Sequence, residues 1–236
     1  MRQLALPLLE PAAFYATAEF IEDAGNAAAL RWLAEPRSWP QGRLVLCGPS
    51  GAGKTHLLHV MARAHGWALL QGPGLRGLPE IPERGAAVDE ADLPGEEAAL
   101  LHLMNACAEA RLPLLLAAPS PPARWGLRLA DLRSRLAATV VAALAEPSDA
   151  LLEALFAKHL AERQLVLEPG LVESIRLRLP RSAAATREAV ARLDRASLAA
   201  GRLTRPIALA AIAPLLEGDA PMAGVPAPLP SGPALL

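Results

Sequence analysis

The segment that most constrains the fold of this chain is residues 44–57, Leu-Val-Leu-Cys-Gly-Pro-Ser-Gly-Ala-Gly-Lys-Thr-His-Leu. It joins an apolar run to a glycine-rich turn and then to the start of a helix, which is the sequence context that a phosphate-binding loop, or P-loop, needs. The alternative is a glycine-rich hairpin beside an unrelated lysine, but the strand pattern before the turn favours the P-loop. The segment therefore predicts a strand-turn-helix unit that binds a nucleoside triphosphate or diphosphate.

The residue types in this turn match the chemistry of phosphate binding. Glycines allow the backbone to curl so that its N–H groups face a phosphate without a Cβ in the way. Lys54 supplies a positive charge for the outer phosphates, and Thr55 a hydroxyl for Mg²⁺ at the start of a helix whose positive end faces the same anion. The predicted nucleotide-binding residues are Gly48, Pro49, Ser50, Gly51, Ala52, Gly53, Lys54, Thr55 and His56.

Composition argues against several classes of protein. The formal net charge of −1 gives no overall attraction to nucleic acid or to an anionic membrane. No apolar run reaches the length of about 18 residues that a membrane span needs, and the short apolar N-terminal stretch is broken by prolines, unlike a signal peptide. Cys47 and Cys107 lie in apolar surroundings without paired spacing, as expected for reduced thiols in a cytoplasmic protein.

Apolar runs alternate with helix-prone stretches through the first two thirds of the chain. Beyond the P-loop strand, the apolar runs are residues 67–70, 86–88, 114–118 and 139–143. The helical stretches are 54–65, 96–110 and 127–137. Strands that alternate with helices imply an α/β fold, in which a parallel sheet is covered on both faces. The Gly- and Pro-rich segment 72–85 predicts a loop without regular structure.

The pattern changes near residue 147. From there to residue 216 it is only helical, over 148–162, 168–179, 182–200 and 206–216. We therefore predict an α/β nucleotide-binding domain over residues 12–146, in which Asn26 is a candidate helix cap, and an all-helical domain over 147–216, whose first helix is capped by Ser148 or Asp149. Residues 1–11 read as an extended, proline-punctuated peptide, and the Pro/Gly/Ala-rich residues 217–236 as a disordered tail.

An acidic residue at the end of a buried strand is the expected partner of a P-loop, because it holds Mg²⁺ through the water shell of the ion. Val88-Asp89-Glu90 fits this role, with Asp89 as the residue that positions the metal and Glu90 as the one that polarises an attacking water. The alternative is a solvated turn, but its place after an apolar run in an α/β pattern favours the functional interpretation. The predicted metal contacts are Thr55 and Asp89.

Two arginines are candidates for contacts with phosphate. Arg135 lies between a predicted helix and the last predicted strand, from which a guanidinium can reach the γ-phosphate of a neighbouring subunit. Arg187 lies early in the 182–200 helix and faces the nucleotide from the helical domain. For each, the alternative is an ordinary surface arginine, which composition alone favours.

Four segments together resemble, in order and spacing, the AAA+ ATPase core of the bacterial replication initiator DnaA. They are residues 48–59, Val-Asp-Glu at 88–90, Leu-Arg-Ser-Arg-Leu at 132–136 and Thr-Arg-Glu at 186–188. The resemblance implies a P-loop AAA+ core with a C-terminal all-helical lid, and ADP or ATP with Mg²⁺ as ligands. DnaA ends in a DNA-binding helix-turn-helix domain. Here a proline-rich stretch follows Leu216, so we expect no dedicated DNA-binding domain.

The chain is more similar to the Hda family of DnaA-related regulators. Its N-terminal Gln-Leu-Ala-Leu-Pro-Leu resembles the peptide by which Hda docks on the DNA polymerase sliding clamp, which implies clamp contacts from Gln3, Leu4, Leu6, Pro7 and Leu8. An amide and apolar anchors suit insertion into a hydrophobic groove. Residues 193–198, Leu-Asp-Arg-Ala-Ser-Leu, are similar to a stretch of the Hda lid.

The resemblance also implies a mechanism. Held on the clamp and in its ADP-bound form, the chain presents Arg135 to the ATP of DnaA as an arginine finger, and hydrolysis of that ATP leaves the initiator inactive. Arg187 matches the nucleotide-sensing arginine of the lid. The sequence leaves open whether the chain forms a homodimer.

One residue departs from the DnaA pattern. Where DnaA has a polar sensor after its fourth core strand, this chain has Ala-Ala-Pro-Ser-Pro-Pro, which puts Pro119 at that position. A proline side chain cannot orient a water molecule, so we expect weak intrinsic hydrolysis, although Glu90 is a residue that an active ATPase keeps. Two alternatives therefore stay open: a self-sufficient AAA+ ATPase of the helicase-loader type, and a DnaA-binding adaptor in which the nucleotide is a structural ligand.

Overall fold

The structure, a computed structural model, describes residues 21–216. Its first part contains the strands β1 (Arg43–Cys47), β2 (Ala68–Gln71), β3 (Ala86–Asp89), β4 (Leu114–Ala118) and β5 (Val140–Ala143). It also contains the helices α2 (Ala27–Ala34), α3 (Lys54–His65), α4 (Glu97–Glu109) and α5 (Ala130–Ala137). The alternation of strands and helices that the apolar runs predict is confirmed.

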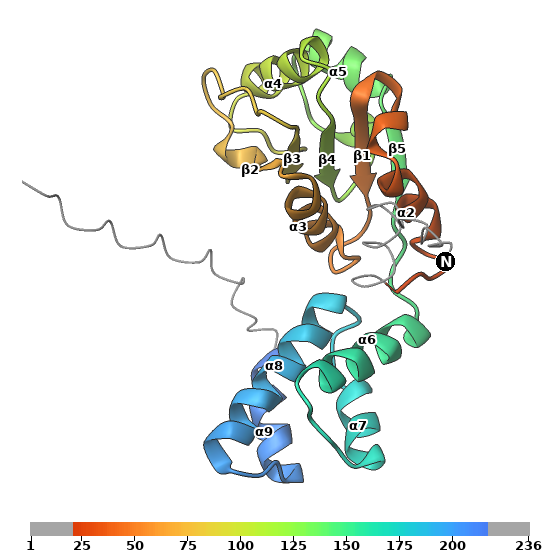
Figure 1. Cartoon of the computed structure of the whole chain (residues 1–236), viewed down its shortest axis with the longest axis vertical. Coiled ribbons are helices and arrows are strands. Elements are labelled where there is room, and N and C mark those ends of the chain that lie inside the picture. The colour runs from red at the N-terminus through yellow and green to blue at the C-terminus, as the bar shows by residue number, and fades with distance from the viewer. Residues whose placement is uncertain (1–20, 217–236) are drawn as a thin grey trace, which may run out of the picture.

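The five strands form one parallel sheet in the order β2-β3-β4-β1-β5 (Figure 1). The register aligns Cys47 at the end of β1 with Ala118 of β4 and with Ala143 of β5. Strand β4 therefore separates β1, which leads into the P-loop, from β3, which ends in Asp89. The turns after these three strands lie at the carboxyl edge of the sheet, where open α/β sheets bind their ligands.

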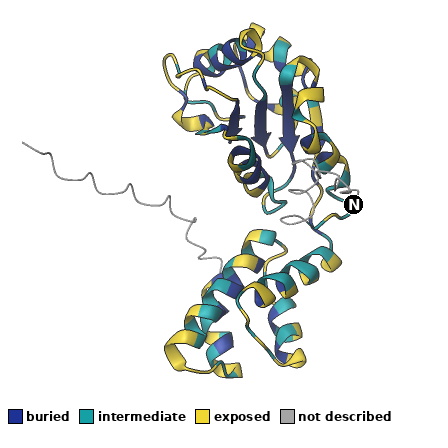
Figure 2. Ribbon diagram, viewed as in Figure 1, coloured by how far each residue is buried: buried dark blue, intermediate teal, exposed yellow. Residues whose placement is uncertain are grey.

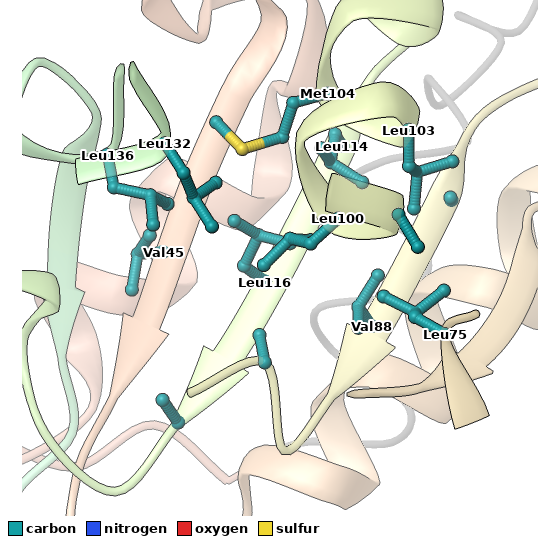
Figure 3. Packing of buried hydrophobic residues seen from close by; sticks show 14 of the residues in the cluster. Val45, Leu75, Val88, Leu100, Leu103, Met104, Leu114, Leu116, Leu132 and Leu136 are labelled. Atoms are coloured by element: carbon teal, nitrogen blue, oxygen red, sulfur yellow. The ribbon is translucent and has the colours of Figure 1, made fainter. Parts of the chain in front are cut away.

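Helices cover both faces of the sheet and give three layers (Figure 1). On one face, the leucines and methionine of α4 and the leucines of α5 pack on Val45, Val88 and Leu116 (Figure 3). On the other face, α2 and α3 pack on a second cluster that includes Leu46 and Leu115. Because side chains on both faces are buried, β1 and β4 are buried at every position, which explains their continuous apolar runs.

From residue 149 to residue 216 the chain forms a helical unit with its own core. Its helices are α6 (Asp149–Glu162), α7 (Pro169–Arg176), α8 (Ala183–Ala200) and α9 (Arg205–Leu216). The buried side chains of this core include Phe156, Ile175, Val190, Leu193 and Ile212. Figure 2 shows these helices apart from the sheet, with buried positions facing one another and exposed positions on the outside. The helical unit lies at the carboxyl edge of the sheet (Figure 1).

Serine side chains begin two helices of this unit. The hydroxyl of Ser148 accepts a hydrogen bond of 3.1 Å from the N–H of Leu151, and that of Ser182 accepts one of 3.1 Å from the N–H of Ala185. Such bonds satisfy backbone donors that have no partner inside a helix. Of the two caps that the sequence allows for α6, the structure has Ser148.

Some details of the sequence prediction are wrong, among them the end of the predicted helix 168–179, which the structure places at Arg176. Asn26 precedes α2, but its Oδ1 accepts a 2.8 Å hydrogen bond from the N–H of Asp23, so its side chain does not cap the helix. Helix α5 begins at Ala130 rather than at residue 127, because the carboxylate of Glu97 accepts the N–H groups of Arg128 and Leu129 and holds them outside the helix. The predicted loop 72–85 contains a single 3-10 turn, at Gly72–Gly74.

Candidate nucleotide-binding site

The P-loop starts where β1 passes into a tightly packed turn. A Cβ on Gly48 would lie 2.5 Å from the carbonyl oxygen of Leu144. Leu144, which directly follows β5, in turn donates its N–H to the oxygen of Cys47 at 2.7 Å. Glycine is therefore required at the first position of the motif, because a side chain there has no room.

Gly51 and Gly53 have left-handed backbone conformations, with φ of +80° and +97°. Residues other than glycine rarely adopt them. Gly53 directly precedes α3, and no atom lies within 4 Å of a Cβ built on it, so the loop is open there to a phosphate. Gly51 instead faces the helical unit, where a Cβ would lie 2.8 Å from Cβ of Ser182. The P-loop thus contacts the segment that caps α8.

The side chain of Lys54 folds back over the turn. Its Nζ donates hydrogen bonds to the carbonyl oxygens of Gly48 and Pro49, at 2.7 and 2.8 Å. An ammonium group has three donors, so a third is left for a phosphate oxygen. Burial lowers the pKa of Lys54, and the negative charges of Asp89 and Asp92 oppose this effect.

Thr55 and Asp89 join the P-loop helix to the end of β3. The Thr55 hydroxyl donates a 2.6 Å hydrogen bond to Oδ2 of Asp89, and the N–H of Glu90 donates to Oδ1 at 3.0 Å. The Asp89 residue is 7% exposed. The structure therefore brings together the two residues that the sequence predicts as metal contacts.

The available oxygen donors fit Mg²⁺ bound together with phosphate. Within residues 21–216, no three His, Cys, Asp or Glu side chains form a group that holds a metal ion by itself. Mg²⁺ at nucleotide sites typically takes one or two side chains and completes its octahedron with phosphate and water oxygens. Thr55 and Asp89 would hold such an ion, which would supply positive charge to the phosphates.

Glu90 directly follows β3 in a left-handed conformation, with φ of +50°, and its side chain is exposed. A Cβ on Gly72 would overlap the carbonyl oxygen of Glu90, so the turn after β3 depends on glycine at that neighbouring position. Glu90 thus lies at the same edge of the sheet as the P-loop, with its carboxylate accessible to solvent.

Asp92 belongs to the same turn, and the sequence prediction missed it. Among the described residues, its buried Oδ1 has no hydrogen-bond partner, and its negative charge acts on the pKa of Lys54. The sequence feature that could have indicated Asp92 is its place as the third acidic residue in Val-Asp-Glu-Ala-Asp at 88–92. An unpaired buried carboxylate oxygen is costly, so this atom is a candidate for a contact with a ligand.

The helical unit brings positive charge to the start of α3. The pKa of His56 is lowered to about 4, first because the surrounding protein desolvates the ring and then because of positive charges that include Arg187 and Lys158. His56 and Arg187 are both exposed residues, and Arg187 lies on the first turns of α8. The predicted Arg187 therefore lies on the side of the helical unit that faces the P-loop helix.

Arg135 lies at the opposite edge of the sheet from the P-loop. The Thr139 hydroxyl, just before β5, donates a 2.9 Å hydrogen bond to the carbonyl oxygen of Arg135. Burial of Arg43, the first residue of β1, lowers its pKa, and the positive charge of Arg135 lowers it further. Arg135 Nε donates to Oδ1 of Asp131 at 3.0 Å, and its side chain is 40% exposed. The structure thus keeps Arg135 away from Lys54 of the same chain.

Pro119 directly follows β4, the strand between β1 and β3, and it is exposed. The next turn is fixed by the indole of Trp125, which donates a 2.7 Å hydrogen bond to the carbonyl oxygen of Ser120. The position between the P-loop and Asp89 is therefore held by a side chain without a hydrogen-bonding group.

Two predicted segments lie outside the described residues. One contains the clamp-contact residues Gln3, Leu4, Leu6, Pro7 and Leu8, and the other is the 217–236 tail. Within residues 21–216, none of the helices combines the length and the apolar character that crossing a membrane requires.

Comparison with known proteins identifies the fold. No protein-family model and no curated protein matches the sequence. Domain III of the replication initiation protein DnaA from Thermotoga maritima matches with a TM-score of 0.69 and 17% identity, over 90% of this chain and 100% of that one. DnaA from Aquifex aeolicus bound to AMPPCP matches with a TM-score of 0.56 and 16% identity, over 73% of this chain and 62% of that one.

A further match is the Holliday junction branch migration motor RuvB from Thermotoga maritima, with a TM-score of 0.54 and 21% identity, over 72% of this chain and 61% of that one. The chain thus spans about three fifths of the length of the Aquifex DnaA and RuvB structures. Together these similarities show that the chain has a DnaA-like fold, as the order of its motifs predicts.

Proposed function

We propose that this chain is a DnaA-related regulator of the Hda type, which binds ADP or ATP with Mg²⁺ and stimulates hydrolysis of the ATP bound to the initiator DnaA. The observation that carries the proposal is the separation of two sites. A phosphate site lies at one edge of the sheet, and an accessible arginine, Arg135, lies at the other. An arginine in this place reaches a nucleotide only when that nucleotide is bound to another protein molecule.

The nucleotide part of the proposal rests on the P-loop and the turn after β3. Lys54 has a donor left for a phosphate oxygen, Gly53 leaves the start of α3 open, and Thr55 is already beside Asp89. Residues 147–216 act as the lid of the 12–146 domain in this proposal, because Ser182 contacts Gly51 and Arg187 lies on the side of His56. Arg187 then senses the nucleotide from the lid.

Arg135 is the arginine finger in this proposal. Arg135 donates its Nε–H to Asp131 at 3.0 Å and its side chain is 40% exposed, so its two terminal nitrogens stay available for a phosphate. Those two nitrogens form the planar fork that binds phosphate oxygens in pairs. An arginine supplied to a γ-phosphate in trans stabilises the charge that develops during transfer and raises the hydrolysis rate by about 10³ to 10⁵.

Hydrolysis by the chain itself is expected to be slow. Pro119 occupies the place between the P-loop and Asp89 where a polar side chain orients water in an active site, and proline has no such group. In this proposal the bound nucleotide keeps the chain folded and able to act on DnaA. The DNA polymerase sliding clamp brings the chain to DnaA in the cytoplasm, through contacts with Gln3, Leu4, Leu6, Pro7 and Leu8.

The test is the rate of ATP loss from DnaA in the presence of DNA-loaded clamp. We compare no addition, the unmodified chain, Arg135→Ala and Gln3→Ala. Stimulation by the unmodified chain that collapses in both variants supports the proposal, because one variant removes the finger and the other the clamp contact. Arg133→Ala is the matched control, since Arg133 is an exposed arginine on the same helix. Normal stimulation by Arg135→Ala would contradict the finger role.

A second function, an autonomous ATPase of the helicase-loader type, is favoured by one observation. The carboxylate of Glu90 is exposed immediately after Asp89, where it can polarise a water molecule. This function predicts substantial turnover by the isolated chain that disappears in Glu90→Gln. A chain that binds DnaA without changing its ATP content would instead be an adaptor.

A further inference from the structure

Asp92 carries a buried carboxylate oxygen that nothing in the proposed regulator mechanism uses. Within the described part of the chain, Oδ1 of Asp92 is inaccessible to solvent and has no hydrogen-bond partner. Asp92 lies in the turn that leaves the carboxyl edge of the sheet after β3. The N–H of Ala91 donates a 2.9 Å hydrogen bond to the carbonyl oxygen of Ala117 in β4, which fixes this turn against the strand between β1 and β3.

Each oxygen of the neighbouring Asp89 already accepts one hydrogen bond. Its Oδ2 accepts from Thr55 and its Oδ1 from the N–H of Glu90. Asp92 is close enough to Lys54 for its charge to act on the ammonium group, yet that ammonium donates to the carbonyl oxygens of Gly48 and Pro49. The turn after β3 therefore contains a carboxylate whose buried oxygen has no donor among the described residues, at the same edge of the sheet as the P-loop.

We propose that Asp92 is a second carboxylate of the Mg²⁺ site, which accepts a hydrogen bond from a water molecule of the metal's hydration shell beside Asp89. The proposal rests on the proposed nucleotide binding and deepens it. Mg²⁺ keeps several of its waters in such sites, and those waters need acceptors in fixed places. Outer-shell acceptors of this kind orient the inner ligands of a metal and typically change its affinity by about 10- to 100-fold.

The charge of Asp92 should change nucleotide affinity in opposite directions with and without Mg²⁺. A carboxylate near the phosphates repels the nucleotide when no cation lies between them, and it strengthens binding once the cation is present. Asp92 is thus expected to lower affinity for nucleotide in the absence of Mg²⁺ and to raise it in the presence of Mg²⁺. A residue that only positioned Lys54 would raise affinity under both conditions.

The experiment is a titration of the full chain with mant-ADP, once with excess Mg²⁺ and once with EDTA. We expect Asp92→Asn to weaken binding about tenfold with Mg²⁺ and to leave it unchanged or tighter with EDTA. Asp92→Glu, which keeps the carboxylate, is expected to retain part of the Mg²⁺ dependence. Glu109→Gln is the matched control, because it removes an exposed carboxylate near the end of α4, at the other edge of the sheet.

Equal weakening under both conditions, or no change under either, would overturn the role of Asp92. Asp92→Ser, which is smaller and also uncharged, gives the same readout if the asparagine variant does not fold. An unmodified chain that fails to bind mant-ADP with Mg²⁺ would instead refute the proposed nucleotide site, and this result is seen before any variant is compared.

Discussion

The Thr55 hydroxyl donates a 2.6 Å hydrogen bond to Oδ2 of Asp89, and this bond ties the first turn of α3 to the end of β3. Because β4 lies between β1 and β3, the bond connects the helix that follows β1 to a strand that is not a neighbour of β1. It therefore fixes the P-loop helix relative to the acidic turn, and it places both predicted metal contacts before any ligand arrives.

Thr55→Ala removes a hydroxyl that both positions Asp89 and is a predicted Mg²⁺ contact. We expect the Mg²⁺-dependent part of ADP affinity to fall about 10- to 100-fold, since removal of a group that orients a metal ligand typically has this effect. Isothermal titration with ADP in Mg²⁺ and in EDTA measures that part. Thr55→Ser keeps the hydroxyl and should retain most of the affinity; a serine variant as weak as alanine would show that the methyl group matters instead.

Gly51→Ala introduces a Cβ where two effects add. The residue has φ of +80°, and the new atom meets Ser182 at 2.8 Å. A left-handed non-glycine residue costs about 1 to 3 kcal/mol, and the contact with Ser182 adds to that strain. Gly77→Ala is the matched control, because φ is +59° there and no atom lies within 4 Å of the new Cβ.

Urea unfolding of both glycine variants, with and without Ser182→Gly, separates the two effects. We expect Gly51→Ala to lower the free energy of unfolding more than Gly77→Ala does, and we expect this difference to shrink in the Ser182→Gly background. Glycine keeps most of the N-cap role and removes the contacting atom. A difference that is the same in both backgrounds would contradict the contact between the P-loop and the helical unit.

Leu193→Ala tests the separate core of the helical unit. Leu193 is 0% exposed on α8, whereas Leu198 on the same helix is 78% exposed. We expect Leu193→Ala to lower the free energy of unfolding of this unit by about 2 to 5 kcal/mol and Leu198→Ala to change it by less than about 0.5 kcal/mol. Urea unfolding followed by far-ultraviolet circular dichroism measures both. Similar losses from the two variants would refute the assigned packing of α8.

His56 makes stability depend on pH in a specific direction. Its pKa in the folded chain, about 4, is below the ordinary value of 6.5, first because of desolvation and then because of positive charges such as Arg187. Between these two values the unfolded chain binds more protons, so the contribution of His56 to stability falls as the pH drops from about 6.5 to about 4 and is constant outside that range.

This direction is checked by measuring the melting temperature of the unmodified chain and of His56→Gln between pH 4 and 7. The melting temperature of His56→Gln should depend less on pH in this range. Arg187→Ala removes one of the positive charges, and we expect the pKa of His56, followed by NMR, to rise toward its ordinary value. His56 is exposed, so solvent screens part of the effect and the rise is small. A lower pKa in Arg187→Ala would contradict the placement of Arg187.

Most of the α/β fold was predictable because both faces of the sheet are buried. Runs such as Leu114–Ala118 must then be apolar throughout, and they stand out from the helical stretches between them. The start of α5 was not predictable, because it depends on Glu97, which reaches Arg128 and Leu129 across the fold. Local pattern carries no information about such a contact.

The candidate site was predictable in part for a similar reason. The P-loop residues are contiguous, so their spacing alone indicates phosphate binding, and Asp89 follows from its place after an apolar run. Asp92 was missed because the burial of its Oδ1 without a hydrogen-bond partner depends on how the turn after β3 packs. Arg135 and Lys54 lie at opposite edges of the sheet because β1 and β5 are parallel neighbours, and Lys54 follows β1 whereas Arg135 precedes β5.

The placement of Arg135 and the P-loop at opposite edges of one sheet gives the molecule a polarity. A contact in which Arg135 of one molecule reaches the nucleotide of the next, repeated in the same direction, is a head-to-tail contact. Each such step leaves one arginine-donating edge and one nucleotide edge at the ends of the row. A chain that docks only through Arg135 binds at the end of the row that presents a nucleotide edge. Its own nucleotide edge is then the outermost one.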